Sequence, residues 1–248
     1  GVRAGRVPRA VGVILGIVEL TGRINRDDFT RGASLADALQ RRLAGLGRFE
    51  QAPLRGMVLG TIGRFWLHRH RLDRALPFLR GAVRHHAGPK EVRHELARSR
   101  TYLANALRRQ GRLAASLAEL DRALLDVRAC EGISPSYART TSMFVRYERA
   151  RTLLATACAV RGARVGAAAR RAKAEALEAE RIRTATGWQP HSGLLRTLVW
   201  IHRTLGEDEE AARMFERLER QVGRSKMPAE RRILAEARGE PREDGEVF

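Results

Sequence analysis

The chain has 248 residues, of which 44% are hydrophobic, and this content is sufficient for one sizeable core or a short row of repeats. It therefore excludes a chain that is disordered as a whole. Basic residues outnumber acidic ones by 47 to 28, a net charge of +19, which favours nucleic acid or an acidic protein face as the partner. Only Cys130 and Cys158 are present, which excludes a disulfide framework and predicts two small core residues.

The positive charge is unevenly distributed along the chain. Residues 1–200 carry 37 basic and 16 acidic side chains, a net charge of +21, whereas residues 201–248 carry 10 and 12, a net charge of −2. The distribution predicts that the first four fifths of the chain contact a negatively charged partner. The alternative is a generally solvated basic surface.

The N-terminal segment contains an apolar stretch from Val11 to Val18 that follows three arginines. The stretch is too short to span a bilayer, which takes about 20 residues, so it predicts a packing helix and no membrane span. Within residues 1–50 we expect degenerate or capping helices. Because the chain begins at Gly1 without an initiator Met, we expect that an upstream segment, such as an organelle transit peptide, has been removed.

From residue 56 onward, small and large apolar residues alternate in a way that predicts two helices joined by a tight turn. The residues that carry this pattern in the first copy are Leu59, Ile62, Gly63, Trp66, Ala75, Leu79 and Ala82, with Pro89 after them. Small side chains let two helices approach closely, and large ones fill the remaining space. Trp66 is therefore expected in the core.

Three further copies of the pattern follow along the chain. The second is built on Leu103, Ala104, Leu107, Gly111, Ser116, Leu120 and Ala123; the third, weaker one on Leu154, Ala155, Cys158, Gly162, Ala167 and Ala174; the fourth on Leu195, Leu198, His202, Gly206, Ala211, Phe215 and Leu218. An N-terminal half-match comprises Val11, Ile14, Leu15, Val18 and Gly22. The corresponding turns fall at His70, Gly111, Gly162 and Gly206.

This pattern resembles the tetratricopeptide repeat over about residues 56–222. The resemblance implies an all-α fold, a right-handed α-solenoid of about four to five antiparallel helix pairs, over residues 1–228, with a charged C-terminal tail over 229–248. One departure is the spacing of the turns, which is 41, 51 and 44 residues where family members have about 34. We therefore expect elongated helices or connections.

In the family that this chain resembles, the first helix of each repeat lines the groove that holds a partner. Counting back from each turn assigns this role to Arg64, His68, Arg98, Asn105, Arg108, Arg109, Arg149, Arg196, Trp200 and Arg203. Guanidinium groups bind phosphates and carboxylates with the same forked geometry, so RNA and an acidic peptide both stay open as partners. For each arginine alone, a solvated surface position is the alternative.

No phosphate-binding glycine loop, nucleophile elbow or HExxH sequence is present, so we expect neither catalytic residues, nor a cofactor, nor a small-molecule substrate. The seven histidines lack the spacing of metal ligands, and we expect His85 and His86 to lie in the last turn of a helix, where they cap carbonyl groups or face the helix dipole. The sequence favours a non-catalytic basic scaffold in a large ribonucleoprotein, such as an organellar ribosome of the mitochondrial or another organelle matrix, with protein neighbours and RNA contacts. The alternative is an adaptor or regulator of the bacterial cytoplasm that binds an acidic peptide or protein.

Overall fold

The computed structural model describes residues 9–26, 28–87, 93–188, 191–223 and 228–239, and over these residues it is all-helical. The helices are α1 (Arg9–Asn25), α2 (Gly32–Ala44), α3 (Arg48–His68), α4 (Leu72–His86), α5 (Arg93–Arg109), α6 (Leu113–Arg128), α7 (Pro135–Ala159), α8 (Ala163–Ala185), α9 (Ser192–Leu205), α10 (Asp208–Val222) and α11 (Pro228–Arg238). The all-α class predicted from the sequence is confirmed. Pro89 lies outside the described residues.

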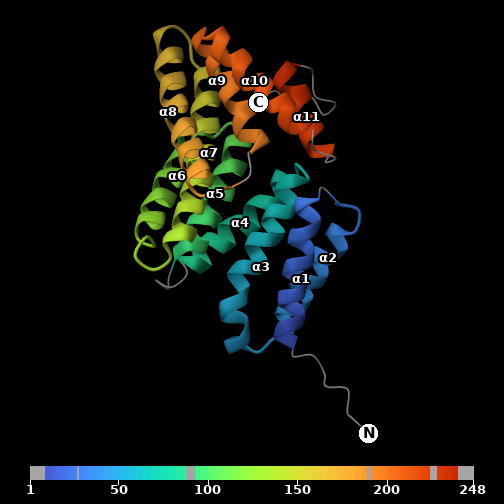
Figure 1. The fold of residues 1–248 in the computed structure, drawn as a ribbon. Helices are drawn as coiled ribbons and strands as arrows, with labels where there is room; N and C mark the ends of the chain where they lie inside the picture. Colours follow the sequence, from blue (N-terminus) through green and yellow to red (C-terminus); the bar gives the residue numbers. More distant parts are fainter. Residues whose placement is uncertain (1–8, 27, 88–92, 189–190, 224–227, 240–248) are drawn as a thin grey trace.

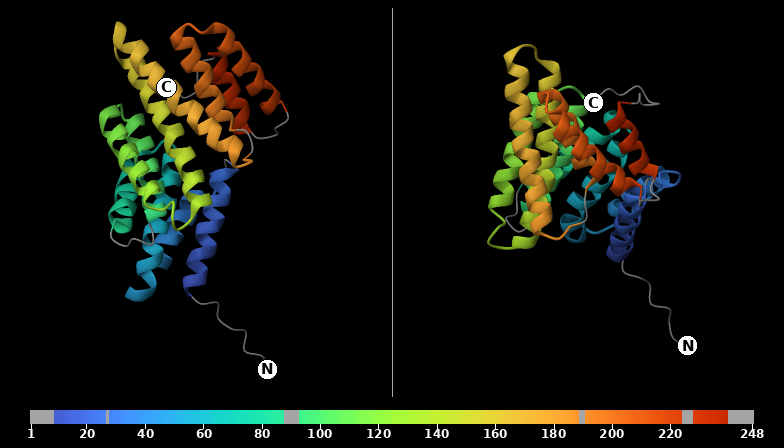
Figure 2. Two further views of the ribbon diagram at one scale, coloured as in Figure 1. Left: turned by 60° about the vertical axis from the view of Figure 1, so that its left-hand side comes forward. Right: turned by 45° about the horizontal axis from the view of Figure 1, so that its top comes forward.

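Each helix packs against the next one along the chain, and each odd-numbered helix also contacts the next odd-numbered helix. The helices α1, α3, α5, α7, α9 and α11 therefore form a row in which each contacts the next, here called the odd-numbered row. The helices α2, α4, α6, α8 and α10 pack beside it and are called the even-numbered row. The rows curve, so that α11 lies on the same side of the molecule as α1 and α2 (Figures 1 and 2). The buried side chains form four successive clusters along this arrangement instead of one central core.

The four turn positions identified in the sequence adopt the backbone conformation that a tight turn requires. His70, Gly111, Gly162 and Gly206 all have positive φ angles, of 56°, 74°, 65° and 72°. Glycine enters this region without steric cost, whereas His70 is an uncommon non-glycine residue there. The long spacing between the second and third turns arises in α7, which has 25 residues.

The small residues of the first repeat act as predicted. A Cβ atom at Gly63 would lie 2.7 Å from Cγ of Leu79, so only glycine lets α3 and α4 approach this closely. Ala75 and Ala82 are fully buried on the facing side of α4, and Trp66 is buried as well. Close packing of these two helices therefore depends on three small residues, Gly63, Ala75 and Ala82.

The sequence prediction for the N-terminal helix has the wrong register. Val11, Ile14, Leu15 and Val18 are exposed, whereas the buried face of α1 comprises Val13, Gly16, Ile17, Leu20 and Ile24. Leu39 of α2 packs directly on Gly16, where a Cβ atom would lie 2.7 Å from its Cδ2. Apolar residues occur on both faces of α1, so periodicity alone could not select the buried one.

One histidine and one cysteine lie in surroundings that the sequence did not predict. His86 lies in the last turn of α4 as expected, but its side chain is buried: its Nδ1 lies 3.2 Å from Oγ of Ser99 on α5, and its ring packs on Gly56 of α3. Cys130 is buried as expected, but Cys158 is exposed. Contacts with α3 and α5 thus decide the surroundings of His86, and the expectation of a buried cysteine is wrong for Cys158.

Helical packing continues beyond residue 228, in the first part of the segment 229–248. Helix α11 packs on α9 and α10, where Ala237 is fully buried beside Leu195, Leu218 and Val222. The helix ends at Arg238.

Candidate anion-binding site

A cavity of about 540 Å³ opens between α5, α7 and α9, and arginines from all three helices line it. Arg108 and Arg109 come from the last turn of α5, Arg151 from the middle of α7, and Arg196 from the first turns of α9. The apolar part of the wall comprises Leu154, Ala155, Ala159 and Trp200. The repeat brings these arginines together because all three helices belong to the odd-numbered row.

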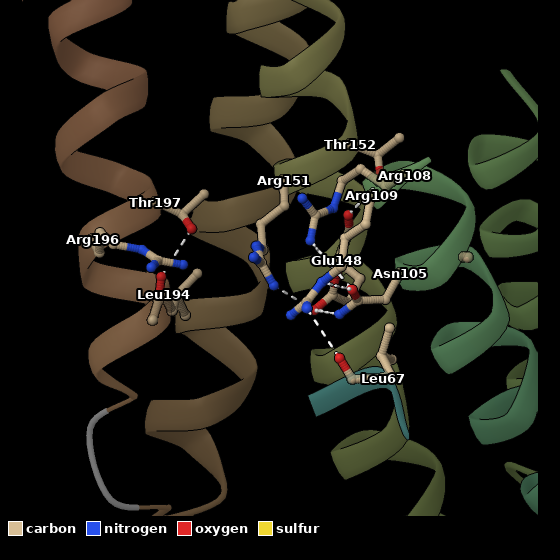
Figure 3. Close-up of polar contacts among 12 residues, drawn as sticks. Leu67, Asn105, Arg108, Arg109, Glu148, Arg151, Thr152, Leu194, Arg196 and Thr197 are labelled. Atoms are coloured by element: carbon tan, nitrogen blue, oxygen red, sulfur yellow. Dashed lines mark hydrogen bonds and ion pairs between the residues drawn. The ribbon is translucent and has the colours of Figure 1, made fainter. Parts of the chain in front are cut away.

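Glu148 lies at the centre of the polar part of this site. Its Oε1 accepts hydrogen bonds from Nη1 of Arg151 at 2.9 Å and from Nδ2 of Asn105 at 3.0 Å, and its Oε2 lies 3.8 Å from Nη2 of Arg108. Glu148 and Arg151 are three residues apart and therefore share one face of α7. Figure 3 shows Arg108, Arg109 and Arg151 around this carboxylate.

Asn105 and Arg109 extend the network along α5 and onto α3. Oδ1 of Asn105 accepts hydrogen bonds from Nε of Arg109 at 3.0 Å and from Nη2 of Arg108 at 3.4 Å. Nη1 of Arg109 donates to the carbonyl oxygen of Leu67 at 3.1 Å. The network thus joins α3, α5 and α7 and holds the guanidinium groups in place.

The pKa values at the site are shifted because several positively charged arginines lie close together and are buried from solvent. Burial lowers the pKa of Arg108, and the charge of Arg151 lowers it further. Burial would raise the pKa of Glu148, but the charges of Arg151 and Arg108 outweigh this effect and hold it below its usual range. Among the described residues, the buried Nε of Arg108 has no hydrogen-bond acceptor, which is uncommon for a buried donor.

Arg196 lies across the cavity on α9 (Figure 3), and its carboxylate partner is Glu236 of α11. Arg196 and Glu236 are both buried. Four guanidinium groups thus line the cavity, and two carboxylates, Glu148 and Glu236, pair with members of the set. The local charge is therefore positive, and the site can accept an anion.

The other two predicted residues of α9 lie beside this cavity. Trp200 contributes to its apolar wall, and the guanidinium group of Arg203 stacks on the Trp200 ring at 5.1 Å from the centroid. Nη1 of Arg203 donates to the carbonyl oxygen of Ala237 at 2.7 Å. Trp200 is thus both packed and part of the site wall.

Arg64, His68 and Arg98 lie farther along the odd-numbered row, on α3 and α5. The guanidinium group of Arg64 stacks on the ring of Tyr102 at 5.5 Å, and Arg98 pairs with Glu95 at 3.6 Å. His68 is exposed, yet partial desolvation and the charges of Arg64 and Arg109 lower its pKa. Burial lowers the pKa of Arg64 and the charge of Arg98 lowers it further, while the charge of Arg64 in turn acts on His68, so the three residues form a second polar group.

Arg149 does not join the site, although the sequence analysis placed it in the groove. Its guanidinium group pairs with Glu175 of α8 at 2.8 Å and with Asp121 of α6 at 3.0 Å. It therefore bridges to the even-numbered row, as does Arg146, which also pairs with Glu175 at 2.9 Å. The residue that faces the cavity from α7 is Arg151.

Arg151, Glu148 and Glu236 were not predicted from the sequence. The spacing of three residues between Glu148 and Arg151 was a local signal of an ion pair, but counting from the Gly162 turn selected Arg149 instead. The pairing of Arg196 with Glu236 joins residues on two helices, and no local pattern signals it.

Over the described ranges, no group of three or more histidine, cysteine or acidic residues is arranged to hold a metal ion. No helix in the same part of the chain is long and apolar enough to cross a membrane. No protein-family model matches the sequence, and no curated protein matches it either.

Proposed function

We propose that this protein is a non-catalytic binding scaffold of the tetratricopeptide type, and that its arginine-lined cavity binds an acidic segment of a partner protein. The observation that carries the proposal is the meeting of Arg108, Arg109, Arg151 and Arg196 at one cavity, where two carboxylates, Glu148 and Glu236, pair with members of the set. Guanidinium forks suit carboxylates in both geometry and charge. A carboxylate of a protein partner is the ligand that we propose for this site.

A right-handed solenoid of antiparallel helix pairs is part of the proposal. The pattern of contacts, in which each helix packs on the next and each odd-numbered helix on the next odd-numbered one, supports it. So do the four turns with positive φ. In such a solenoid the row of odd-numbered helices forms one continuous face, and this face carries the cavity.

The cavity also favours a peptide over nucleic acid. An RNA backbone needs a track of basic residues that neutralise successive phosphates. Here several arginines outside the cavity are used in packing between the two rows: Arg100 pairs with Glu119 and Asp126, and Arg146 and Arg149 pair with Glu175. The charge available for a phosphate track is correspondingly smaller than the net charge of the chain indicates.

A structural role in a ribonucleoprotein, such as an organellar ribosome in the organelle matrix, is the second candidate. The observation that favours it is the net charge of +21 over residues 1–200. That charge attracts any polyanion over a distance of about 10 Å at moderate salt. The two candidates differ in whether a particular set of arginines or the total charge determines binding.

Fluorescence anisotropy with a labelled hexaglutamate peptide and a labelled single-stranded oligouridylate tests both candidates. The double variant Arg109→Gln/Arg151→Gln removes two charges from the cavity. The control, Arg80→Gln/Arg139→Gln, removes two charges from exposed positions on α4 and α7, where neither arginine pairs with an acidic residue among those that the structure describes. Both variants have the same net charge, so long-range attraction is matched.

We expect hexaglutamate affinity to fall by at least about tenfold, or about 1.4 kcal/mol, in the cavity variant and to stay within about twofold in the control. Equal losses in the two variants would show that diffuse charge binds the peptide and would overturn the proposal. Binding of oligouridylate alone, with a steep dependence on salt, would support the ribonucleoprotein role instead. Thermal melts of each variant establish that it is folded.

A further inference from the structure

The N-terminal helix has an apolar face that no described residue covers. Val11, Ile14, Leu15 and Val18 follow the spacing of one helix face, and their exposed fractions are 38%, 44%, 58% and 62%. The opposite face of α1 already supplies the core with Val13, Ile17, Leu20 and Ile24. The exposed face is therefore surplus to folding, and a contiguous apolar patch of this kind is typical of a contact surface.

A second cavity, of about 250 Å³, begins at the end of this apolar face. Val18 of α1, Met57 and Gly60 of α3, and Tyr102 of α5 are part of its wall. The polar side chains that line it include Glu95 and Arg98 of α5. Met57 is 39% exposed. The absence of a side chain at Gly60 contributes to the hollow, because the atoms nearest to a Cβ atom there would lie 3.8 Å away. The cavity can therefore accept an apolar side chain.

One face of α5 connects the two cavities. Arg98, Tyr102, Asn105 and Arg109 are spaced by four, three and four residues, so they lie along the same side of the helix. Arg98 and Tyr102 line the second cavity, and Arg109 lines the arginine-lined cavity. Arg98 lies in the middle of the stretch of α5, from Glu95 to Tyr102, that lines the second cavity. The eleven residues from Arg98 to Arg109 span about 16 Å, which is thus the approximate distance between the two cavities along α5.

We infer that the partner is a segment that carries acidic residues beside an apolar anchor, with the acidic residues in the arginine-lined cavity and the anchor against Val18, Met57 and Tyr102. This inference rests on the proposed function and adds a second contact to it. Charge complementarity identifies the acidic part, since four arginines and two carboxylates meet at its site. The exposed apolar face of α1 identifies the other part.

The separation along α5 predicts the spacing within the partner. An extended peptide advances about 3.3 Å per residue, so about five residues span about 16 Å. The probes are labelled synthetic peptides with a Glu-Glu-Glu block and a Leu-Leu pair, joined by Ser-Gly spacers of two, five or eight residues. Peptides with the reverse order of the two blocks are included, and a peptide with Ser-Ser in place of Leu-Leu is the acidic reference.

We expect one of the peptides with the five-residue spacer to bind about tenfold tighter than the acidic reference, which corresponds to about 1.4 kcal/mol. The double variant Val18→Ser/Met57→Ser should abolish this gain and leave binding of the acidic reference unchanged. The matched control is Leu125→Ser/Leu177→Ser, which changes two exposed apolar residues, 61% and 47% accessible, on the even-numbered row. This control should keep the full gain.

The outcomes separate the inference from the proposed function. If the acidic reference binds through Arg109 and Arg151 but Leu-Leu adds nothing at any spacing, the inference is wrong and the proposed function stands. If the acidic reference does not bind, the proposed function fails as well. A second copy of this chain is the other possible occupant of the α1 face; a dimer in sedimentation that Val18→Ser/Met57→Ser dissociates would overturn the inference in favour of self-association.

Discussion

Two glycines one helical turn apart on α3 should respond in opposite ways to the same substitution. A Cβ atom at Gly56 would lie 2.5 Å from Cδ2 and 2.8 Å from Cε1 of the His86 ring, distances that real Cβ atoms essentially never show. A Cβ atom at Gly60 would have its nearest neighbours, Cβ of Ala82 and Oγ of Ser99, at 3.8 Å, which is ordinary van der Waals contact. The pair therefore tests the packing of α3 on α4 and α5.

The expected magnitudes follow from these distances. Gly60→Ala removes glycine from a helix interior without a clash and should stabilise the protein by about 0.5–1 kcal/mol. Gly56→Ala stabilises the helix by the same amount, but the new methyl group must displace the side chain of His86. That side chain is buried, and its Nδ1 lies 3.2 Å from Oγ of Ser99. Overpacking costs about 1–3 kcal/mol, and loss of a hydrogen bond about 0.5–1.5 kcal/mol more, so the net effect should be destabilisation by about 1–3 kcal/mol.

Thermal unfolding followed by circular dichroism measures both effects, since 1 kcal/mol shifts the midpoint by about 2–4 °C in a chain of this size. We expect the midpoint to rise for Gly60→Ala and to fall for Gly56→Ala. A double-mutant cycle with His86→Ala should remove most of the penalty at Gly56, because the truncated side chain leaves room for the new methyl group. A rise of the midpoint in both single variants would refute the contact between Gly56 and His86.

Three further predictions concern caps, charge and packing. Nδ1 of His191 accepts a hydrogen bond from the backbone N–H of Leu194 at 3.1 Å, so His191→Ala should lower the stability of the fold by about 1 kcal/mol. Because burial lowers the pKa of His191, the stabilisation by this residue is complete above pH 6.5 and is lost as the pH falls below that value. Thermal melts at several pH values should therefore show a smaller fall of the midpoint with decreasing pH in the variant than in the unmodified protein. Glu148→Gln leaves three arginines around a neutral group and should destabilise the fold by about 3 kcal/mol at neutral pH in chemical denaturation, whereas a loss under about 0.5 kcal/mol would mean that the carboxylate does not balance their charge. Ala82→Leu should overpack α3 against α4 and lower stability by about 1–3 kcal/mol, while Leu125→Ala, at an exposed position of α6, should change it by less than about 0.5 kcal/mol.

The sequence was informative wherever a residue's role depends on its own backbone or on its near neighbours. A turn between two helices needs a positive φ, and glycine marks it at positions 111, 162 and 206. The alternation of small and large residues likewise identified the contact of Gly63 with Leu79, because both residues belong to one helix pair. Prediction of the all-α class and of the pairs from α3 onward needed no more than these local patterns.

The sequence was less informative about which way each arginine points. Counting back from the turns assumed the same helix register in every copy, and this assumption selected Arg149 where the structure places Arg151 beside the cavity. The choice is made by Glu175 on α8 and Asp121 on α6, which hold Arg149 on the other side of α7. On α1 the same limitation appeared as the choice between two apolar faces, which contact with Leu39 of α2 decides.

By itself, then, the sequence determined the helices from α3 to α10, their turns, and the excess of positive charge, because each of these follows from residues close together in the chain. The tertiary structure alone decided that Arg108, Arg109, Arg151 and Arg196 line one cavity, and that Glu148 and Glu236 pair with members of this set. These groups come from four helices, and a charge loses its hydration only when all of those helices pack together. The balance of charge at the site is thus a property of the packed rows and cannot be read from any single helix.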